Sequence, residues 1–300
     1  MDPLPPAFDN GQDIPPTVAQ GQNKSLPPRE AVQSPSVDRP YYGDPERYEA
    51  EYAPFHSDAT WYAARAAALG GPALELGCGT GRVLVALAAA GLTVDGLDNA
   101  PAMLARARER VARLPPALAA RIGLHQADMS AFRLPGRYRV ILAPLNALMH
   151  LTEDAALAGC LERVAAHLAP DGRFLFDLSV PQPDLLQDHG DERGLPLRSL
   201  TIRGIPYLQR ERQRYDPATR TSRVRYRFEP QVPGAEPFDT ELALHLIPPE
   251  DVPGLLRASG LRPLARLADF RGGAPGPEDV MQLWEASLEP AGGGRGPMPA

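Results

Sequence analysis

The sequence predicts an α/β fold: a doubly wound, mostly parallel sheet with an antiparallel β insertion after its fifth strand. Three observations lead to this prediction. Short apolar segments alternate with helical segments between residues 72 and 180, a glycine-rich loop follows the first apolar segment, and residues 181–247 replace the alternation with period-two patterns. Parallel neighbours need long crossovers, so the alternation favours parallel pairing with helices on both faces of the sheet.

The elements can be assigned in order along the chain. Residues 45–71 mix tyrosines with acids and then become an Ala-rich helix that ends at Gly70 and Gly71. The expected strands are 72–77, 92–98, 121–128, 138–145 and 173–180, and the expected helices between them are 82–91, 100–114 and 152–172. Pro101 lies in the first turn of the second of these helices, and Thr152 is the expected cap of the third.

The insertion carries a hairpin signal. Residues 205–230 contain Asp216 and Pro217 between two runs that alternate polar with apolar or aromatic residues, which is typical of an antiparallel hairpin. Strands inserted here would lie over the ligand-binding edge and could form a lid. The chain then returns to a helix at 248–260 and to strands at 261–270 and 279–289.

Composition indicates a globular protein with a tail. The chain of 300 residues is 43% hydrophobic, but residues 1–40 are rich in Pro, Gln, Ser and Asn without any apolar period, which predicts disorder. The tail lacks the features of a secretory signal, and no stretch approaches the roughly 20 apolar residues of a membrane span. Abundant Arg, Ala, Gly and Pro are typical of a GC-rich bacterial genome. We therefore expect a cytoplasmic, bacterial protein that does not contact membranes.

Charge and cysteine content exclude some functions. The formal net charge is -6, which argues against a protein built to coat nucleic acid. Cys78 and Cys160 are the two cysteines of the chain, too few for a disulfide framework or a convincing metal site. We expect no bound metal.

The glycine loop is the most informative segment. It reads LELGCGTGR over residues 74–82, between a predicted strand and a predicted helix. A dinucleotide fingerprint would place Arg82 where close helix packing needs glycine or alanine, and a phosphate-binding P-loop would need a lysine that is absent. The remaining pattern, Glu75-x-Gly77-x-Gly79-x-Gly81, resembles the class I S-adenosylmethionine-dependent methyltransferases, which have a Rossmann-like fold.

This resemblance is clear over about residues 41–180 and implies a cofactor and a set of contacts. In the family, the glycines let the loop approach the methionyl and ribosyl parts of S-adenosylmethionine, as the lack of Cβ and the free amides of a helix start would allow. The resemblance places Asp98 at the ribose hydroxyls and Asp128 at the adenine amino group, with Met129 beside it. The cofactor-binding residues expected are Glu75, Gly77, Cys78, Gly79, Gly81, Asp98, Asn99, Met103, Asp128, Met129 and Leu145.

Several of these residues also have purely structural interpretations. Asp98 could be an ordinary acid at a strand end, Met103 could belong to the helix core, and the glycines could form a tight turn without a ligand. The order of the three elements, glycine loop, then Asp98, then Asp128, favours the methyltransferase interpretation. It implies one methyltransferase domain over residues 41–290, with residues 181–247 as an inserted β lid.

Methyl transfer from a sulfonium is an in-line displacement, so alignment and electrostatics supply most of the rate and a dedicated catalytic residue can be absent. After the fourth strand, Asn146 could orient an acceptor amine or hydroxyl, or brace the loop. His150 could remove a proton from the acceptor, or pack at a helix start. In small-molecule N-methyltransferases an aromatic-rich amino-terminal arm folds over the cofactor, which makes Tyr42 a further catalytic candidate.

Arginines in the insertion leave a second function open. They include Arg203, Arg210, Arg212, Arg214, Arg220, Arg223, Arg225 and Arg227. The cluster could dock RNA or an anionic substrate, but alternation along a hairpin favours a solvated face. We therefore expect methyl transfer to a nitrogen or oxygen of a small-molecule acceptor, with nucleic acid as an unlikely partner. The alternatives are an RNA or protein methyltransferase, and a non-catalytic module that binds the cofactor.

Overall fold

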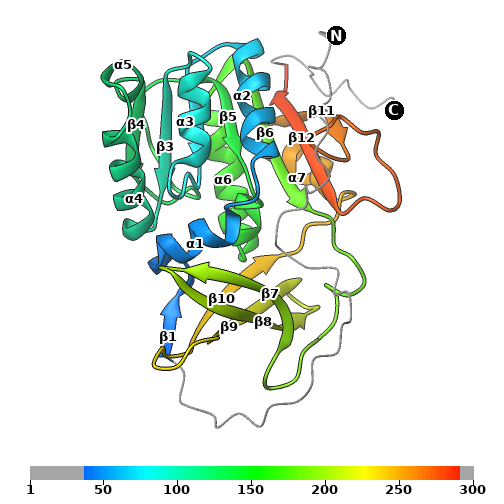
Figure 1. Cartoon of the computed structure of the whole chain (residues 1–300). Coiled ribbons are helices and arrows are strands. Elements are labelled where there is room, and N and C mark those ends of the chain that lie inside the picture. Colours follow the sequence, from blue (N-terminus) through cyan, green and yellow to red (C-terminus); the bar gives the residue numbers. More distant parts are fainter. Residues whose placement is uncertain (1–36, 291–300) are drawn as a thin grey trace, which may run out of the picture.

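The computed structural model describes residues 37–290, which form two β-sheets with helices packed mainly around the larger one (Figure 1). Residues 1–36 of the predicted tail lie outside the described residues, as do residues 291–300. Within the described part of the chain, no helix is long and apolar enough to cross a membrane.

The larger sheet has seven strands in the order β11-β12-β6-β5-β2-β3-β4. Their bounds are β2 Ala73–Leu76, β3 Val94–Asp98, β4 Ile122–Gln126, β5 Tyr138–Ala143, β6 Leu168–Ser179, β11 Leu261–Leu267 and β12 Met281–Leu288. Strands β2 to β6 pair in parallel, and β12 is antiparallel to both of its neighbours. The predicted doubly wound, mostly parallel sheet is confirmed. Strand order reverses at β2, so the loop after β2 lies at the switch point where such sheets bind ligands.

Helices cover both faces of this sheet (Figure 1). They are α2 Ser57–Leu69, α3 Arg82–Ala89, α4 Pro101–Ala112, α5 Pro116–Ala119, α6 Asp154–His167 and α7 Val252–Ala258. Strand β5 shows the two faces by its alternation: Val140 and Leu142 pack in one core with α2 and α3, whereas Ile141 packs in the other with α6 and α7. A central strand buried on both faces explains why its sequence is a continuous apolar run.

Three local details differ from expectation. The expected Ala-rich helix that ends at Gly70 is α2, but the tyrosine-rich segment before it also forms a helix, α1 (Pro45–Tyr52). Helix α6 begins two residues after Thr152, and its cap position is occupied by Glu153, whose side chain makes no capping hydrogen bond. Strand β6 begins at Leu168, earlier than expected.

The second sheet has five strands in the order β1-β10-β9-β8-β7. Their bounds are β1 Val37–Pro40, β7 Leu195–Ile202, β8 Ile205–Asp216, β9 Thr221–Pro230 and β10 Phe238–His245. The predicted hairpin appears as β8 and β9, with Asp216 at the end of β8. Strand β1 contains the last residues of the segment assigned to the tail, and it pairs in parallel with β10.

One face of the second sheet, here called the inner face, is turned toward the larger sheet and α1 (Figure 1). Its residues are Tyr207, Gln209, Glu211, Gln213 and Tyr215 of β8, Ser222, Val224, Tyr226 and Phe228 of β9, and Phe238, Thr240, Leu242 and Leu244 of β10. Most of these side chains are buried, whereas Arg223 and Arg225 on the opposite face of β9 are exposed.

A buried ion pair within α1 lies where this helix meets the inner face. The guanidinium of Arg47 pairs with the carboxylate of Glu51, and the side chains of both are 1% exposed. Arg47 also donates to the carbonyl of Tyr41 in the short helix η1 (Tyr41–Gly43). Gln209 Nε2 donates to Glu51 Oε1 at 2.8 Å, which ties the pair to β8. These contacts make α1 and the second sheet one packed unit.

Replacing Glu51 by glutamine should destabilise the protein strongly, because the Arg47 charge would stay buried without its carboxylate. We expect the free energy of unfolding to fall by about 3 kcal/mol, measured by urea denaturation. Glu46→Gln on the same helix is the matched control, since its side chain is 48% exposed, and it should cost less than about 1 kcal/mol. Equal effects of the two substitutions would contradict the role of the buried pair.

Candidate active site

The loop after β2 is built from glycines in left-handed conformations. Gly77, Gly79 and Gly81 have φ values of +67°, +53° and +79°. A Cβ on Gly81 would come within 3.3 Å of the Ala107 side chain on α4, so both conformation and space call for glycine there. Helix α3 begins directly after the loop, and its cap residue, Gly81, has no side chain to bind the first amides. The loop therefore presents free backbone donors at the carboxyl edge of the sheet.

Two carboxylates flank this loop. Asp98, at the end of β3, accepts a hydrogen bond from the amide of Gly79 through Oδ2 and one from Ala100 through Oδ1, each at 2.8 Å. Glu75 in β2 is 3% exposed, and its Oε2 is buried without a hydrogen-bond partner. Burial raises the pKa of Asp98, and it raises the pKa of Glu75 well above its usual range. Glu75 is thus short of a hydrogen-bond donor, which a ligand could supply, and each oxygen of Asp98 has a second lone pair for a ligand donor.

The remaining predicted cofactor residues lie around the same edge in different environments. Cys78 is buried, and its amide donates to the carbonyl of Leu97 at 2.9 Å. Asn99 is exposed, whereas Met103 is fully buried. Asp128 is exposed and accepts from the amide and hydroxyl of Ser130 through Oδ1. The loop with Asp128 and the half-buried Met129 starts beside Asp98, because Ala127 donates to the Asp98 carbonyl at 3.1 Å.

Tyrosines of the amino-terminal arm lie over the glycine loop. The Tyr48 hydroxyl of α1 is 3.8 Å from the point where Gly79 would carry a Cβ. Tyr42 of η1 lies next to Tyr48, with ring centroids 6.2 Å apart. On the other side of α1, Glu49 pairs with Arg106 at 2.7 Å and with Arg110 at 2.5 Å, both on α4. The amino-terminal arm therefore lies over the glycine loop, and Glu49 ties its helix α1 to α4. This is the position that was predicted for the arm.

The structure brings together two of the predicted catalytic residues. His150 lies in the short helix η2 (Ala147–His150) after β5, and its Nε2 is 2.7 Å from the Tyr42 hydroxyl. Burial lowers the pKa of His150 to about 4 and raises the pKa of Tyr42 well above its usual value. At neutral pH the pair is therefore an uncharged imidazole and an uncharged phenol, hydrogen-bonded to each other across 108 residues of sequence.

The loop between β5 and η2 is held by a residue that the sequence analysis missed. Asp177, near the end of β6, accepts from Leu145 N at 2.8 Å and from the Tyr62 hydroxyl at 2.7 Å through Oδ1. Its Oδ2 accepts from Asn146 N at 3.1 Å. Burial raises the pKa of Asp177 to about 6. The sequence feature that could have revealed Asp177 is the presence of one acid in the otherwise apolar fifth strand.

Leu145 and Asn146 both adopt left-handed conformations, with φ values of +57° and +60°. Such values are unfavourable for residues other than glycine, so the contacts to Asp177 must hold the loop in place. The Asn146 side chain accepts from Ser179 N at 2.6 Å and is 2% exposed. Of the two roles considered for Asn146, these contacts favour bracing of the loop.

Two arginines, one on α2 and one on α3, bind acids on different sides of α2. Arg65 of α2 is bound to Glu285 of β12 by contacts of 2.8 to 3.1 Å. Arg82, the first residue of α3, instead forms a bidentate ion pair with the fully buried Asp58. Arg82 therefore fixes α2 against the start of α3, beside the glycine loop.

Most arginines of the insertion are paired with acids. Arg210 and Arg227 contact Glu229, Arg225 contacts Asp239, and Arg214 contacts Asp188. These pairs neutralise much of the basic charge, as expected for a solvated face.

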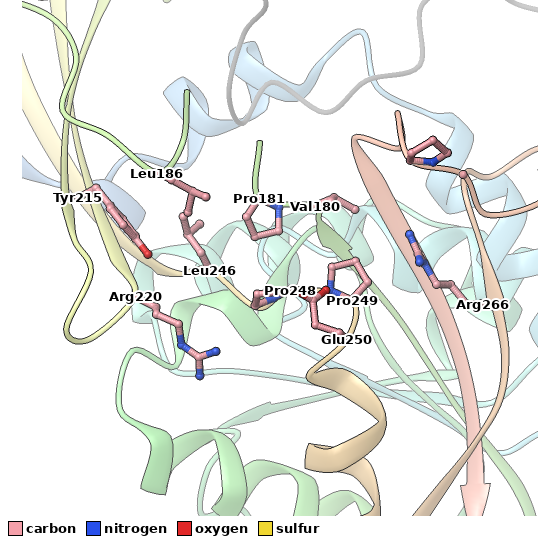
Figure 2. A pocket seen from close by; sticks show the side chains of 12 residues that line it. Val180, Pro181, Leu186, Tyr215, Arg220, Leu246, Pro248, Pro249, Glu250 and Arg266 are labelled. Atoms are coloured by element: carbon pink, nitrogen blue, oxygen red, sulfur yellow. The ribbon is translucent and has the colours of Figure 1, made fainter. Parts of the chain in front are cut away.

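A cavity of about 610 Å³ opens at the edge of the second sheet (Figure 2). Its walls come from the chain just after β6, from the β8–β9 turn and from the segment before α7, and they include Val180, Pro181, Leu186, Tyr215 and Leu246. None of the lining residues belongs to the glycine loop or to η2. The cavity is therefore separate from the loop, although two of its lining residues, Val180 and Pro181, directly follow the carboxyl end of β6 in the larger sheet.

Comparison with known proteins finds a family for one segment of the chain. The model of the methyltransferase domain family matches residues 73–172, the segment from β2 into β6. Residues 73–172 form a methyltransferase domain. The match covers the glycine loop, Asp98, Asp128 and the loop of Asn146 and His150.

The curated relatives of this segment come from Streptomyces and Bacillus. The chain is 36% identical over 132 residues to dTDP-3-amino-3,6-dideoxy-α-D-glucopyranose N,N-dimethyltransferase of Streptomyces fradiae, covering 44% of this chain and 47% of that protein. The chain spans less than half the length of the curated relatives it matches.

Two solved structures extend the likeness of the fold beyond the methyltransferase domain. The methyltransferase CcbJ of Streptomyces caelestis superposes with a TM-score of 0.72 at 22% identity, covering 84% of this chain and 99% of that one. CalS10, an amino pentose methyltransferase of Micromonospora echinaspora solved with S-adenosylmethionine bound, gives a TM-score of 0.61 at 25% identity, covering 81% and 96%.

The residues around the glycine loop fit S-adenosylmethionine. Its amino group and ribose hydroxyls are donors, and the methyltransferase domain offers the unpartnered Glu75 Oε2 and the carboxylate of Asp98. Its carboxylate would suit the uncapped start of α3. The left-handed glycines leave room for close approach of the ligand to the backbone.

Asp98→Ala should weaken binding of S-adenosylmethionine at least about tenfold, a loss of about 1.4 kcal/mol, because the ribose hydroxyls lose their acceptor and Gly79 loses its carboxylate. Isothermal titration calorimetry measures this directly. Asp95→Ala is the matched control on the same strand: Asp95 binds His125 and Tyr138 instead of the glycine loop. Unchanged affinity in Asp98→Ala would remove this residue from the ribose role.

Asp177 should give the protein a distinctive pH dependence. Its pKa is raised in the folded state to about 6, so the folded protein holds a proton that the unfolded chain has lost. Stability from this group is present at low pH and is lost as the pH rises from about 4 through 6. The difference between the free energies of unfolding of wild type and Asp177→Asn should therefore decrease by about 3 kcal/mol between pH 4 and pH 7. Parallel pH profiles in urea denaturation would contradict this assignment.

Proposed function

We propose that the protein transfers a methyl group from S-adenosylmethionine to a nitrogen or oxygen of a small-molecule acceptor, with an amine as the favoured group. The observation that carries the proposal is the contact between Tyr42 and His150, at 2.7 Å, beside a glycine loop suited to the cofactor. The relatives named as N,N-dimethyltransferase and amino pentose methyltransferase support an amine acceptor.

S-adenosylmethionine supplies a methyl group already activated by its sulfonium, so the protein's task is to align the acceptor and exclude water. We propose that Tyr42 and His150 contact the acceptor. An imidazole with a pKa of about 4 is a poor acceptor for the proton of an ammonium group. His150 therefore acts as a neutral hydrogen-bonding group that orients Tyr42 and the acceptor N–H, and the amine enters in its neutral form.

The same proposal assigns supporting roles around this pair. Asp177 and Asn146 act as positioning residues, because they hold the loop that leads into η2. Glu75, Asp98 and the backbone of the glycine loop bind the cofactor. We further propose that Asp128 and Met129 contact the adenine, since their loop begins beside Asp98.

We also propose that the protein acts in the bacterial cytoplasm. The relatives are bacterial, and Cys78 and Cys160 are free and buried, which suits a reducing compartment. Binding of RNA by the insertion is not favoured, because its arginines are largely paired with acids.

The proposal is tested by incubating the protein with S-adenosylmethionine and a panel of small amines and alcohols, and following formation of S-adenosylhomocysteine. We expect turnover with an amine, and His150→Gln should lower kcat at least about tenfold while the Kd for S-adenosylmethionine changes less than twofold. Because His150 is already neutral, its loss should not alter the shape of the pH–rate profile between pH 6 and 9.

Two results would count against the proposal. An inflection near pH 6.5 in the wild type that disappears in His150→Gln would show that the ring works as a proton acceptor. Tight cofactor binding without turnover of any acceptor would instead favour a non-catalytic binding module.

A further inference from the structure

The cavity at the edge of the second sheet is built from segments that lie far apart in the sequence. Lining residues come from the chain after β6, from the β8–β9 turn, from the segment before α7, and from β11 and the loop that follows it. The volume of about 610 Å³ is that of sites that hold drug-sized molecules. The residues assigned above to the cofactor and to methyl transfer do not line it, so the cavity has no role yet.

Hydrogen bonds between these segments hold the cavity open. Leu246 N donates to the carbonyl of Arg220 at 2.8 Å, which ties the segment before α7 to the β8–β9 turn. Gln182 Nε2 donates to the carbonyl of Asp279 at 2.8 Å, which ties the chain after β6 to the loop before β12. The walls are therefore fixed in pairs, and a ligand would enter a preformed site at a small cost in ordering.

The walls are stiff and largely apolar. Four of the twelve lining residues are prolines: Pro181, Pro248, Pro249 and Pro277. Proline has a fixed φ and no backbone N–H, so these walls offer flat apolar rings without main-chain donors. Leu186 and Leu246 add further apolar surface. Such walls fit the faces of an apolar ring system.

The charges of the cavity are balanced. Arg220 and Arg266 lie on opposite sides of the cavity, with prolines between them (Figure 2). Arg220 is paired with Asp251, and Arg266 is paired with Asp279 at 3.0 Å. Glu250 adds a further acid to the lining. A ligand with several negative charges, such as a diphosphate, does not suit this surface, because its charges would meet acids as well as arginines.

The paired arginines still offer hydrogen-bond donors. A guanidinium has five N–H groups and cannot accept a hydrogen bond. In Arg266, Nη2 binds Asp279, and the side chains of Arg220 and Arg266 remain 40% and 24% exposed. Both therefore retain N–H groups for a ligand. The matching group on an uncharged ligand is a hydrogen-bond acceptor such as a carbonyl oxygen.

We propose that this cavity binds an uncharged, mainly apolar ring molecule that carries carbonyl groups. The prolines contact the faces of the ring, and Arg266 and Arg220 donate hydrogen bonds to the carbonyl oxygens. This binding site does not depend on the proposed function.

The ring molecule has two possible sources, a separate compound or the far end of the methyl acceptor. The position of the cavity is compatible with the second source. Val180 of the lining directly follows Ser179, whose amide donates to Asn146 Oδ1 at 2.6 Å. Asn146 immediately precedes η2, the short helix that carries His150.

Three naphthalene probes of similar shape test the chemistry of the cavity. They are 6-propionyl-2-dimethylaminonaphthalene, which is uncharged and has a carbonyl, 2-dimethylaminonaphthalene, which lacks the carbonyl, and 6-dimethylamino-2-naphthoate, which is anionic. Their fluorescence reports entry into an apolar site. We expect the wild type to bind the propionyl probe with a Kd in the micromolar range, and the naphthoate at least about tenfold more weakly.

Arg266→Met tests the donor, because methionine keeps an apolar side chain and lacks the guanidinium. We expect the propionyl probe to bind at least about fivefold more weakly, whereas the Kd of 2-dimethylaminonaphthalene changes less than about twofold. Arg223→Met is the matched control. Arg223 is exposed on the outer face of β9 and does not line the cavity, so neither affinity should change.

A second pair of variants keeps the test independent of the ion pair of Arg266. Leu186 lines the cavity but is 45% exposed, so Leu186→Glu should leave the fold intact. We expect it to weaken binding of both uncharged probes at least about tenfold, because it places a charge on the apolar wall. Leu195→Glu, at a position of β7 that is 52% exposed and outside the lining, should change neither affinity.

The inference is overturned if the wild type fails to bind the propionyl probe at concentrations up to about 0.1 mM. Tighter binding of the naphthoate, or equal affinity of wild type, Arg266→Met and Leu186→Glu for the propionyl probe, would overturn it as well. Inhibition of methyl transfer that is competitive with the acceptor would support the acceptor's far end as the occupant, and binding without competition would support a separate molecule. Binding is measured without turnover, so absence of methyl transfer would refute the proposed function alone.

Discussion

The buried ion pair between Arg47 and Glu51 is the contact on which the arrangement of the site depends. It fastens α1 to the inner face of the second sheet, with Gln209 as the link to β8. Because α1 and η1 carry Tyr48 and Tyr42, the same pair sets how these tyrosines meet the glycine loop and His150. A charged pair in this position constrains geometry more than a hydrophobic contact would, since an unpaired charge there is costly.

The fold was predictable because its signals are local and repeated. Alternating strand and helix segments, and glycines after the first strand, sufficed for the parallel sheet and for the loop at its switch point. The hairpin of β8 and β9 was visible in the same way. The cap of α6 was misassigned, because Thr152 lies one residue too early and tertiary packing decides where the helix begins. Strand β1 has no signal of its own, because it depends on pairing with β10.

Residues of the candidate site could be predicted only where they belong to a recognisable sequence motif. Tyr42 and His150 were each candidates, but their contact joins positions 108 residues apart, and nothing in either local sequence encodes it. Asp177 was missed because one acid in an apolar strand has no distinctive spacing. The pair of Arg65 with Glu285 of the last strand was invisible for a similar reason.

The ion pairs on the two sides of α1 differ in exposure. Arg47 and Glu51 are shielded from water, whereas Glu49 and its partners Arg106 and Arg110 are between about one fifth and one third exposed. Salt screens exposed pairs far more than buried ones. Raising the ionic strength therefore loosens α1 from α4 and leaves it fastened to the second sheet. The cover that α1 forms over the glycine loop is therefore weaker at high salt on its α4 side than on its β8 side.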